Sequence, residues 1–135
     1  MDIQLAQCFI TVHDPEESLA FYRDGLGLEL RNDVNSGGFR WLTLSPPSQP
    51  GVEIVLEQAG HPGRSAQDGD TVLELVTKGA MNAANFRTDD LDSTFEKLRG
   101  SGAEVLQEPM DQPWGVRDCA FRDPSGNMVR INQAT

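Results

Sequence analysis

The sequence of 135 residues predicts an α+β fold built from two βαβββ modules, residues 3–58 and 82–133, with a linker at residues 59–81. Three observations support this prediction. A strand, helix, strand, strand, strand order occurs twice, each helix begins at a capping aspartate, and segments of the two halves align at a nearly constant spacing. Because repeated units fix the architecture of a chain, we expect residues 1–135 to form a single domain.

The first half shows the five elements of one module in order. The segment "AQCFITV" is rich in β-branched and aromatic residues and ends at the turn-forming group "HDP", as a strand does. A helix follows, with Asp14 as its N-cap and Pro15 at its first position, and Gly25 and Gly27 end it. Three further strands are predicted in "LELRNDV", "FRWLTLS" and "GVEIVLEQ".

The second half repeats this order. When Asp14 is set against Asp90, the apolar positions of the two predicted helices match, and "EIVLEQ" aligns with "MVRINQ" in the last strand of each half. The closing stretch "FRDPSGNMVRINQ" is typical of a hairpin, with a tight turn at residues 123–126 and Arg130 inside its second strand. The chain therefore looks like a duplicated unit.

The linker contains one further candidate element, "DTVLELVTKG". Asp70 would cap a helix there and Gly79 would end it, with apolar residues on one face. Alternating apolar residues keep a strand as the alternative. We favour the helix.

Charge and hydropathy limit the classes of partner. Eleven basic against 21 acidic residues give a formal net charge of −10, which argues against nucleic acid and anionic membranes as partners. No apolar run reaches the roughly 20 residues needed to cross a bilayer, and the N-terminus lacks the features of a signal peptide. We expect a cytoplasmic protein.

The cysteines and histidines do not form a recognisable site. Cys8 and Cys119 are isolated, without a CxxC pair or a nearby histidine, so we expect two buried thiols rather than a disulfide or a zinc site. His13 precedes an Asp-Pro pair and His61 lies in a Gly/Pro loop, so we expect both to be solvated turn residues.

Three stretches carry a resemblance to a known family: "FYRDGLGLEL", "LDSTFEKLRGSGAEV" and "WGVRDCAFRDPSGNMVRI". Together with the duplicated unit, they resemble the vicinal oxygen chelate superfamily, which includes glyoxalase I, bleomycin-resistance proteins and extradiol dioxygenases. The resemblance spans roughly residues 3 to 133. It implies two modules whose curved mixed sheets enclose a cleft, often completed in a homodimer, and metal-dependent members take two ligands from each module.

The repeat alignment locates the positions that resemble those metal ligands, which are Gln7, Val55, Ala83 and Arg130. Only Gln7 has a suitable donor, and a guanidinium repels a dication, so we expect no metal and no other cofactor. A register shift of two residues would keep the strand parity and leave a divalent metal as the alternative. The best shifted set is Gln7, Glu57, Asn85 and Asn132, which would still be a poor site.

Arg130 could bind an anionic group of a ligand through its five donors. The alternatives are that it pairs with an acidic neighbour such as Glu53 or Glu57, or that it lies on an outer face. Trp114 lies in a loop where its ring could stack on a flat ligand. For Trp41, inside a strand, we favour core packing, with a place in the binding site as the alternative.

Parity adds the remaining candidates, since Phe9 shares a strand face with Gln7, and Asn85 shares one with Ala83. We assign no catalytic residue. The predicted ligand-binding residues are Gln7, Phe9, Trp41, Val55, Glu57, Ala83, Asn85, Trp114 and Arg130.

The resulting functional hypothesis is a homodimeric protein that binds or sequesters a small organic molecule, such as a drug or metabolite, without a metal. One alternative is a metal-dependent lyase, isomerase or dioxygenase of the same superfamily. The other is an interaction domain whose cleft is vestigial. Enzymatic activity is left open, and binding is the favoured function.

Overall fold

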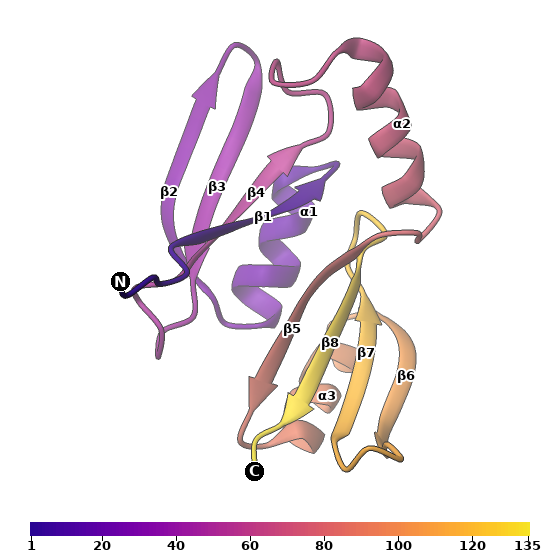
Figure 1. Ribbon diagram of the computed structural model, residues 1–135. Helices are drawn as coiled ribbons and strands as arrows, with labels where there is room; N and C mark the ends of the chain where they lie inside the picture. The colour runs from indigo at the N-terminus through magenta and orange to yellow at the C-terminus, as the bar shows by residue number, and fades with distance from the viewer. The chain divides into compact units, whose positions relative to one another are not determined.

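The computed structural model describes residues 1–135, which divide into two compact units, Met1–Glu74 and Leu75–Thr135. Each unit contains one four-stranded mixed sheet (Figure 1). No helix of the protein has both the length and the apolar composition required to cross a bilayer.

The first unit folds as one βαβββ module. Its sheet has the strand order β1-β4-β3-β2, with β1 and β4 parallel and the other neighbours antiparallel. Its elements are β1 (Gln7–Val12), α1 (Pro15–Leu19), the π-helical segment η1 (Ala20–Gly25), β2 (Glu29–Ser36), β3 (Phe39–Ser45) and β4 (Glu53–Gln58).

The second unit repeats this topology with the strand order β5-β8-β7-β6, and β5 and β8 are its parallel pair. The predicted α+β fold of two βαβββ modules is therefore confirmed. Its elements are β5 (Asn82–Thr88), α3 (Leu91–Gly100), β6 (Glu104–Asp111), β7 (Arg117–Arg122) and β8 (Met128–Gln133). Helix α2 (Ala66–Thr77) precedes them and contains the boundary between the units.

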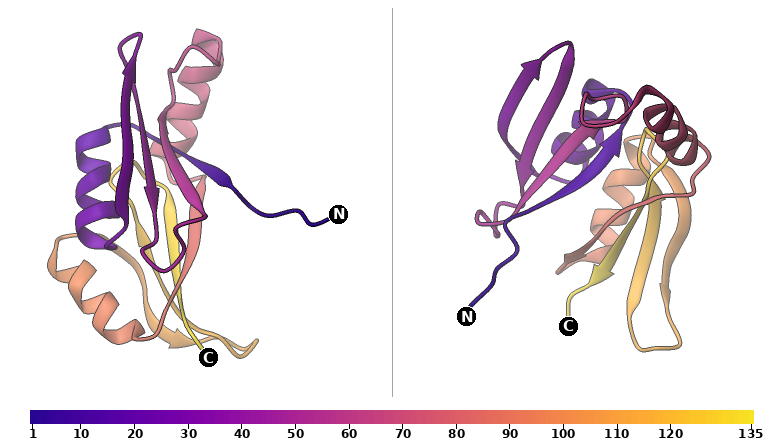
Figure 2. Two further views of the ribbon diagram at one scale, coloured as in Figure 1. Left: turned by 90° about the vertical axis from the view of Figure 1, so that its left-hand side faces the viewer. Right: turned by 45° about the horizontal axis from the view of Figure 1, so that its top comes forward.

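In each unit the core lies between the helix and one face of the sheet (Figure 2). Asp14 caps α1 by accepting hydrogen bonds from the backbone N–H groups of Glu16 and Glu17, as predicted. Leu19, Phe21 and Tyr22 of the first helix are buried, as are the sheet residues Ile10, Leu42, Leu44 and Leu56. The second core contains Leu91, Phe95, Leu98, Cys119, Phe121, Val129 and Ile131.

The predicted hairpin turn before β8 is held by a buried carboxylate. Oδ1 of Asp123 accepts hydrogen bonds from the backbone N–H groups of Ser125, Gly126 and Asn127, each at 2.9 Å. Gly126 has a φ of 121°, and a Cβ atom there would lie 2.2 Å from the carbonyl oxygen of Val76. Only glycine fits this turn without a shift of the backbone.

Helix α2 begins earlier than predicted. We expected Asp70 as its cap, but the helix starts at Ala66, and Oγ of Ser65 accepts a hydrogen bond from the backbone N–H of Asp68. The apolar spacing from Val72 onward marked only the later part of the helix, because residues 66–68 at its start are exposed and form no apolar stripe. Gly79, with a φ of 83°, follows the helix as expected.

Candidate functional site

The face of each sheet that does not pack on α1 and η1, or on α3, is called here the open face. Successive side chains of a strand alternate between faces, and directly paired residues share one. Since Ile10 and Leu56 lie in the core, Phe9 and Val55 lie on the first open face, where they pair with each other. By the same pairing, Trp41 joins this face opposite Glu57.

The first open face is apolar at its centre and exposes large side chains. Phe9 is 59% exposed and Val34 is 51% exposed, while Val55 is buried. Trp41 pairs with Val34 and is partly exposed, whereas its neighbour Leu42 is completely buried. The expectation that Trp41 packs in the core is therefore wrong, because strand parity turns its ring to the opposite face from the helix.

Glu57 is the polar centre of this face. Its Oε1 accepts hydrogen bonds from Nη2 of Arg64 at 2.9 Å and from the hydroxyl of Thr11 at 3.4 Å. Its Oε2 lies 3.2 Å from Nε2 of His61. The Glu57 side chain is only 13% exposed, so this carboxylate is recessed and held by a cation.

His61 orients this cluster rather than facing solvent. Its Nδ1 accepts a hydrogen bond from the backbone N–H of Gly63 at 3.0 Å, so Nε2 is the nitrogen that carries a proton and donates to Glu57. The ring lies 6.0 Å from that of Trp41. The prediction of a solvated turn residue is wrong for His61, because the loop after β4 folds back over the strand from which it leaves.

The second open face is polar. Nη1 of Arg130 lies 3.2 Å from Oδ2 of Asp118 and donates to Oε1 of Gln107 at 3.1 Å. Oδ1 of Asp118 accepts two further hydrogen bonds, from the amide groups of Gln107 and Gln112, each at 2.9 Å. Asp118 is 1% exposed, so a buried carboxylate is saturated with donors.

The ionisation of Asp118 follows from this arrangement. Burial by itself would raise its pKa, but the hydrogen bonds from Gln112 and Gln107 and the charge of Arg130 more than offset that effect, so the pKa lies below its ordinary value. The alternative that Arg130 pairs with an acidic neighbour is right in kind, but the partner is Asp118 and not Glu53 or Glu57. The hairpin sets Asp118 diagonally beside Arg130 on the adjacent strand, and the two side chains form an ion pair there.

The side chains of the other predicted residues make none of the hydrogen bonds of these clusters, although Asn85 neighbours Arg130 in the sheet. Gln7 is exposed and donates a hydrogen bond to Glu53 at 2.9 Å. Ala83 lies in an irregular part of the β5 and β8 pairing, after which Asn85 pairs with Arg130. Trp114, at the turn between β6 and β7, is 70% exposed, and the backbone carbonyl of Gln112 closes this turn by accepting a hydrogen bond from the N–H of Gly115.

The residues that sequence reasoning missed are Thr11, His61, Arg64, Gln107, Gln112 and Asp118. Two signals could have found some of them. Asp118 follows from the hairpin register once the turn at residues 123–126 is fixed, and Arg64 lies seven positions after Glu57, in the loop that follows β4. Gln107 depends on a bulge that no sequence pattern marks.

The side chains at the four positions that resemble metal ligands form a poor donor set. Val55 and Ala83 carry no donor atom, and Arg130 is a cation already paired with Asp118. In the first unit, the donors of the register-shifted set, Gln7 and Glu57, are also too far apart to share a metal ion. Gln7 pairs with Glu53, and Glu57 lies four residues further along the strand, a separation of about 13 Å at the rise of a β-strand. Transition-metal sites need several donors at about 2 Å, which these residues do not offer.

The two thiols are not suited to nucleophilic chemistry. Burial raises the pKa of Cys119 to about 11, and it also raises the pKa of Cys8. A thiol needs a lowered pKa to react at neutral pH, so neither cysteine adds a reactive group to the open faces.

Similarity to known proteins agrees with this architecture. A profile of the Glyoxalase/Bleomycin resistance protein/Dioxygenase superfamily matches residues 4–131. An uncharacterised Bacillus subtilis protein, YurT, is 32% identical over 92% of this chain and 94% of its own. A probable lactoylglutathione lyase of Synechocystis is 28% identical over 97% of this chain and 95% of its own.

Solved structures extend the same likeness. The crystal structure of UcmS2 has a TM-score of 0.89 and 34% identity, covering 99% of this chain and 100% of that one. TnmS3, an antibiotic binding protein from Streptomyces, has a TM-score of 0.75 and 26% identity, covering 99% and 98% of the two chains. The chain belongs to the glyoxalase, bleomycin resistance protein and dioxygenase superfamily.

Proposed function

We propose that this protein binds a small organic molecule on the open faces of its sheets and that it does so without a metal or other cofactor. Binding or sequestration of a drug or metabolite is the proposed role, and the predicted ligand-binding residues are the proposed contacts. The single observation that carries the proposal is the exposed apolar surface beside a recessed carboxylate on the first sheet.

That surface has the composition of a ligand site. Phe9 and Trp41 offer aromatic rings, and Val34 adds exposed aliphatic area next to them. Small-molecule sites combine apolar and aromatic walls with a few polar groups in fixed positions. Glu57, held by Arg64 and His61, is such a group, because its orientation is set before any ligand arrives.

The metal-free part of the proposal rests on donor chemistry. One amide among four positions cannot supply the ligands of a divalent ion, and Arg130 would repel it. The likeness to TnmS3, an antibiotic binding protein of the same fold, supports binding as the role.

Metal analysis tests the cofactor part directly. Protein purified without chelators should contain far less than one equivalent of zinc, nickel, iron or manganese by inductively coupled plasma mass spectrometry. A stoichiometric metal that survives dialysis would contradict the proposal and favour the enzyme alternative. If such a metal is found, the likeness to a probable lactoylglutathione lyase indicates which activity to assay. The formation of lactoylglutathione is then measured with and without added divalent metal.

Ligand screening tests the binding part. A panel of planar aromatic natural products, both cationic and neutral, should contain members that raise the melting temperature, because a ligand at 100 times its Kd adds about 2.7 kcal/mol to the free energy of unfolding. Phe9→Ala should weaken binding of such a hit. Leu5→Ala is the matched control, since Leu5 is also exposed but lies outside the sheet.

Trp114 needs its own comparison. Trp114→Ala should weaken binding, and Trp114→Phe should retain most of it, because both aromatic rings can stack on a flat ligand. A complete panel without any shift in melting temperature would contradict binding and leave the vestigial interaction domain as the better account.

The homodimer is part of the proposal as well. Its support is the resemblance to the superfamily, in which a second chain often completes the cleft. Light scattering coupled to size-exclusion chromatography should give twice the 14.8 kDa mass of the chain. A measured mass of 14.8 kDa, with ligand binding retained, would contradict the dimer and leave the binding proposal in place.

A further inference from the structure

We propose a second ligand site in the first unit, at a pocket between α2 and the ends of β1, β3 and β4, which takes compact organic ammonium ions. The pocket has a volume of about 460 Å³. Its lining residues all belong to Met1–Glu74, and none of them belongs to the predicted ligand-binding set or to the Glu57 cluster. The proposal therefore does not depend on binding at the open faces.

The walls of the pocket are mainly apolar. Val12, Phe39, Ala59, Ala66 and Leu73 line it, together with two glycines. Its volume falls within the roughly 300–1,000 Å³ that small-molecule sites occupy. Leu73 is 39% exposed on α2, so part of the apolar wall is open to an entering ligand.

The strand end of the pocket is fixed in shape by two hydrogen bonds of the Gln58 side chain. Nε2 of Gln58 donates to the carbonyl oxygen of His13 at 3.3 Å, and its Oε1 accepts from the backbone N–H of Arg40 at 3.0 Å. Gln58 thus ties the end of β1 to the start of β3 and forms a polar wall of the pocket.

The helix side of the pocket is fixed by close packing. Gly69 of α2 is buried, and a Cβ atom there would lie 3.2 Å from the carbonyl oxygen of Ala59. The absence of a side chain lets α2 approach the loop after β4, so the two walls are held at a set separation. A ligand meets a largely preformed cavity, which reduces the entropy lost on binding.

Asp70 supplies the charge preference. It is the one acidic residue that lines the pocket, and none of the ion pairs of the protein involves it. His13 is the only other titratable side chain of the lining. A mainly apolar pocket with an exposed aspartate outside any ion pair among its lining residues favours a ligand with an apolar body and a cationic end, and the net charge of −10 attracts such cations.

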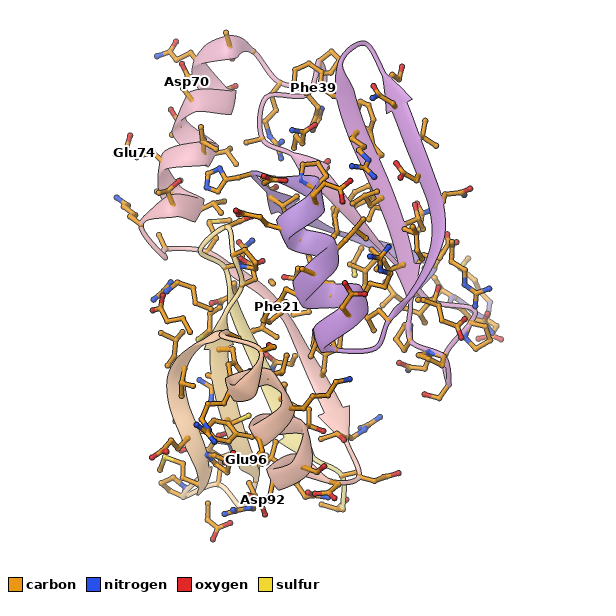
Figure 3. All side chains as sticks on the ribbon, turned by 180° about the vertical axis from the view of Figure 1, so that it is seen from behind. Phe21, Phe39, Asp70, Glu74, Asp92 and Glu96 are labelled. Atoms are coloured by element: carbon orange, nitrogen blue, oxygen red, sulfur yellow. The ribbon has the colours of Figure 1, made fainter.

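The helix also offers a matched control. Glu74 lies one turn after Asp70 on α2 and does not line the pocket, while Phe39 lies across from them on β3 (Figure 3). Glu74→Gln therefore removes the same charge from the same helix as Asp70→Asn. Both residues are exposed, so neither substitution disturbs the core.

The experiment uses 2-phenylethylammonium as the probe and two-dimensional amide NMR of the full chain as the readout. The backbone N–H signals of Gly60 and Gly69, which line the pocket, should shift and saturate with added probe. Asp70→Asn should raise the Kd roughly two- to fivefold, the range of an exposed ion pair, and Glu74→Gln should leave the Kd unchanged. The anion 3-phenylpropanoate should bind more weakly than the cation.

Ala66→Phe should abolish saturable binding, because its ring fills the cavity from an exposed position while the remaining amide spectrum keeps the native pattern. The proposal is overturned if the shifts map outside the pocket, if Asp70→Asn and Glu74→Gln weaken binding equally, or if the Ala66→Phe protein binds the probe as the wild type does. Equal affinity for 3-phenylpropanoate would also overturn it, since the charge preference would be absent.

Discussion

On the first sheet, Val55 lies beside Phe9 and shares an apolar open face with Trp41, whereas the equivalent place on the second sheet holds Arg130 beside Asn85. Both sheets have the same strand order and the same parallel pair. The backbone hydrogen bonds and the helix-facing side chains maintain the fold, so the open faces are free to differ. A duplicated architecture can therefore keep its topology while one face becomes apolar and the other becomes an ion-paired network.

The largest effect should come from the buried carboxylate of the second face. Asp118→Ala leaves Arg130, Gln107 and Gln112 without their shared acceptor, so the free energy of unfolding should fall by about 3 kcal/mol. Urea denaturation measures this change. Asp92→Ala is the control, because Asp92 also pairs with an arginine but at a 71% exposed position, where the loss should stay below about 1 kcal/mol.

Glycine substitutions in the turns that precede β4 and β8 should differ in their effect on the free energy of unfolding by nearly as much. Gly126→Ala forces a Cβ atom against the carbonyl oxygen of Val76 at an unfavourable φ, so unfolding should become easier by about 2 kcal/mol. Gly51, which holds the matching place before β4, has nothing within 4 Å of its added Cβ atom. Thermal unfolding of Gly51→Ala should show almost no change, and equal effects at both sites would mean that the two turns are more alike than their backbones indicate.

The two tryptophans should respond unequally to truncation. Trp41→Ala removes a partly buried ring beside His61 and should cost about 1 kcal/mol of stability, whereas Trp114→Ala at the exposed turn should stay within about 0.5 kcal/mol. Chemical denaturation of both variants measures the difference. A large loss for Trp114→Ala would place its ring in a packed environment instead.

The smallest effect concerns the pH dependence of stability. Because the folded pKa of Asp118 is lowered, its charged form stabilises the protein above the unfolded pKa of about 4, and this contribution is lost as the pH falls through the folded pKa. Asp118→Asn has no such titration. The difference in free energy of unfolding between wild type and Asp118→Asn, measured by urea denaturation at a series of pH values, should shrink below about pH 4. A difference that grows in acid would contradict the lowered pKa of Asp118.

The fold was accessible from sequence because its signals are local. Asp14 caps the first helix through backbone groups two and three positions away, and Asp123 holds its turn through groups two to four positions away. Strand parity likewise depends only on neighbours in sequence. Such features are visible in the sequence as capping residues, glycines and alternating apolar residues. Because the order of elements occurs twice, the patterns of the two halves support the same assignment.

The sites were harder to predict because their partners come from different elements. The sequence by itself determined the two modules, the hairpin and the strand positions of Val55 and Arg130. Only the tertiary structure decided that His61 and Arg64 return to Glu57 and that Asp118 with Gln107 neutralises Arg130. The physical reason is that a loop's path and a strand's bulge follow from packing between elements, whereas caps, turns and alternation follow from the residues next to them in the chain.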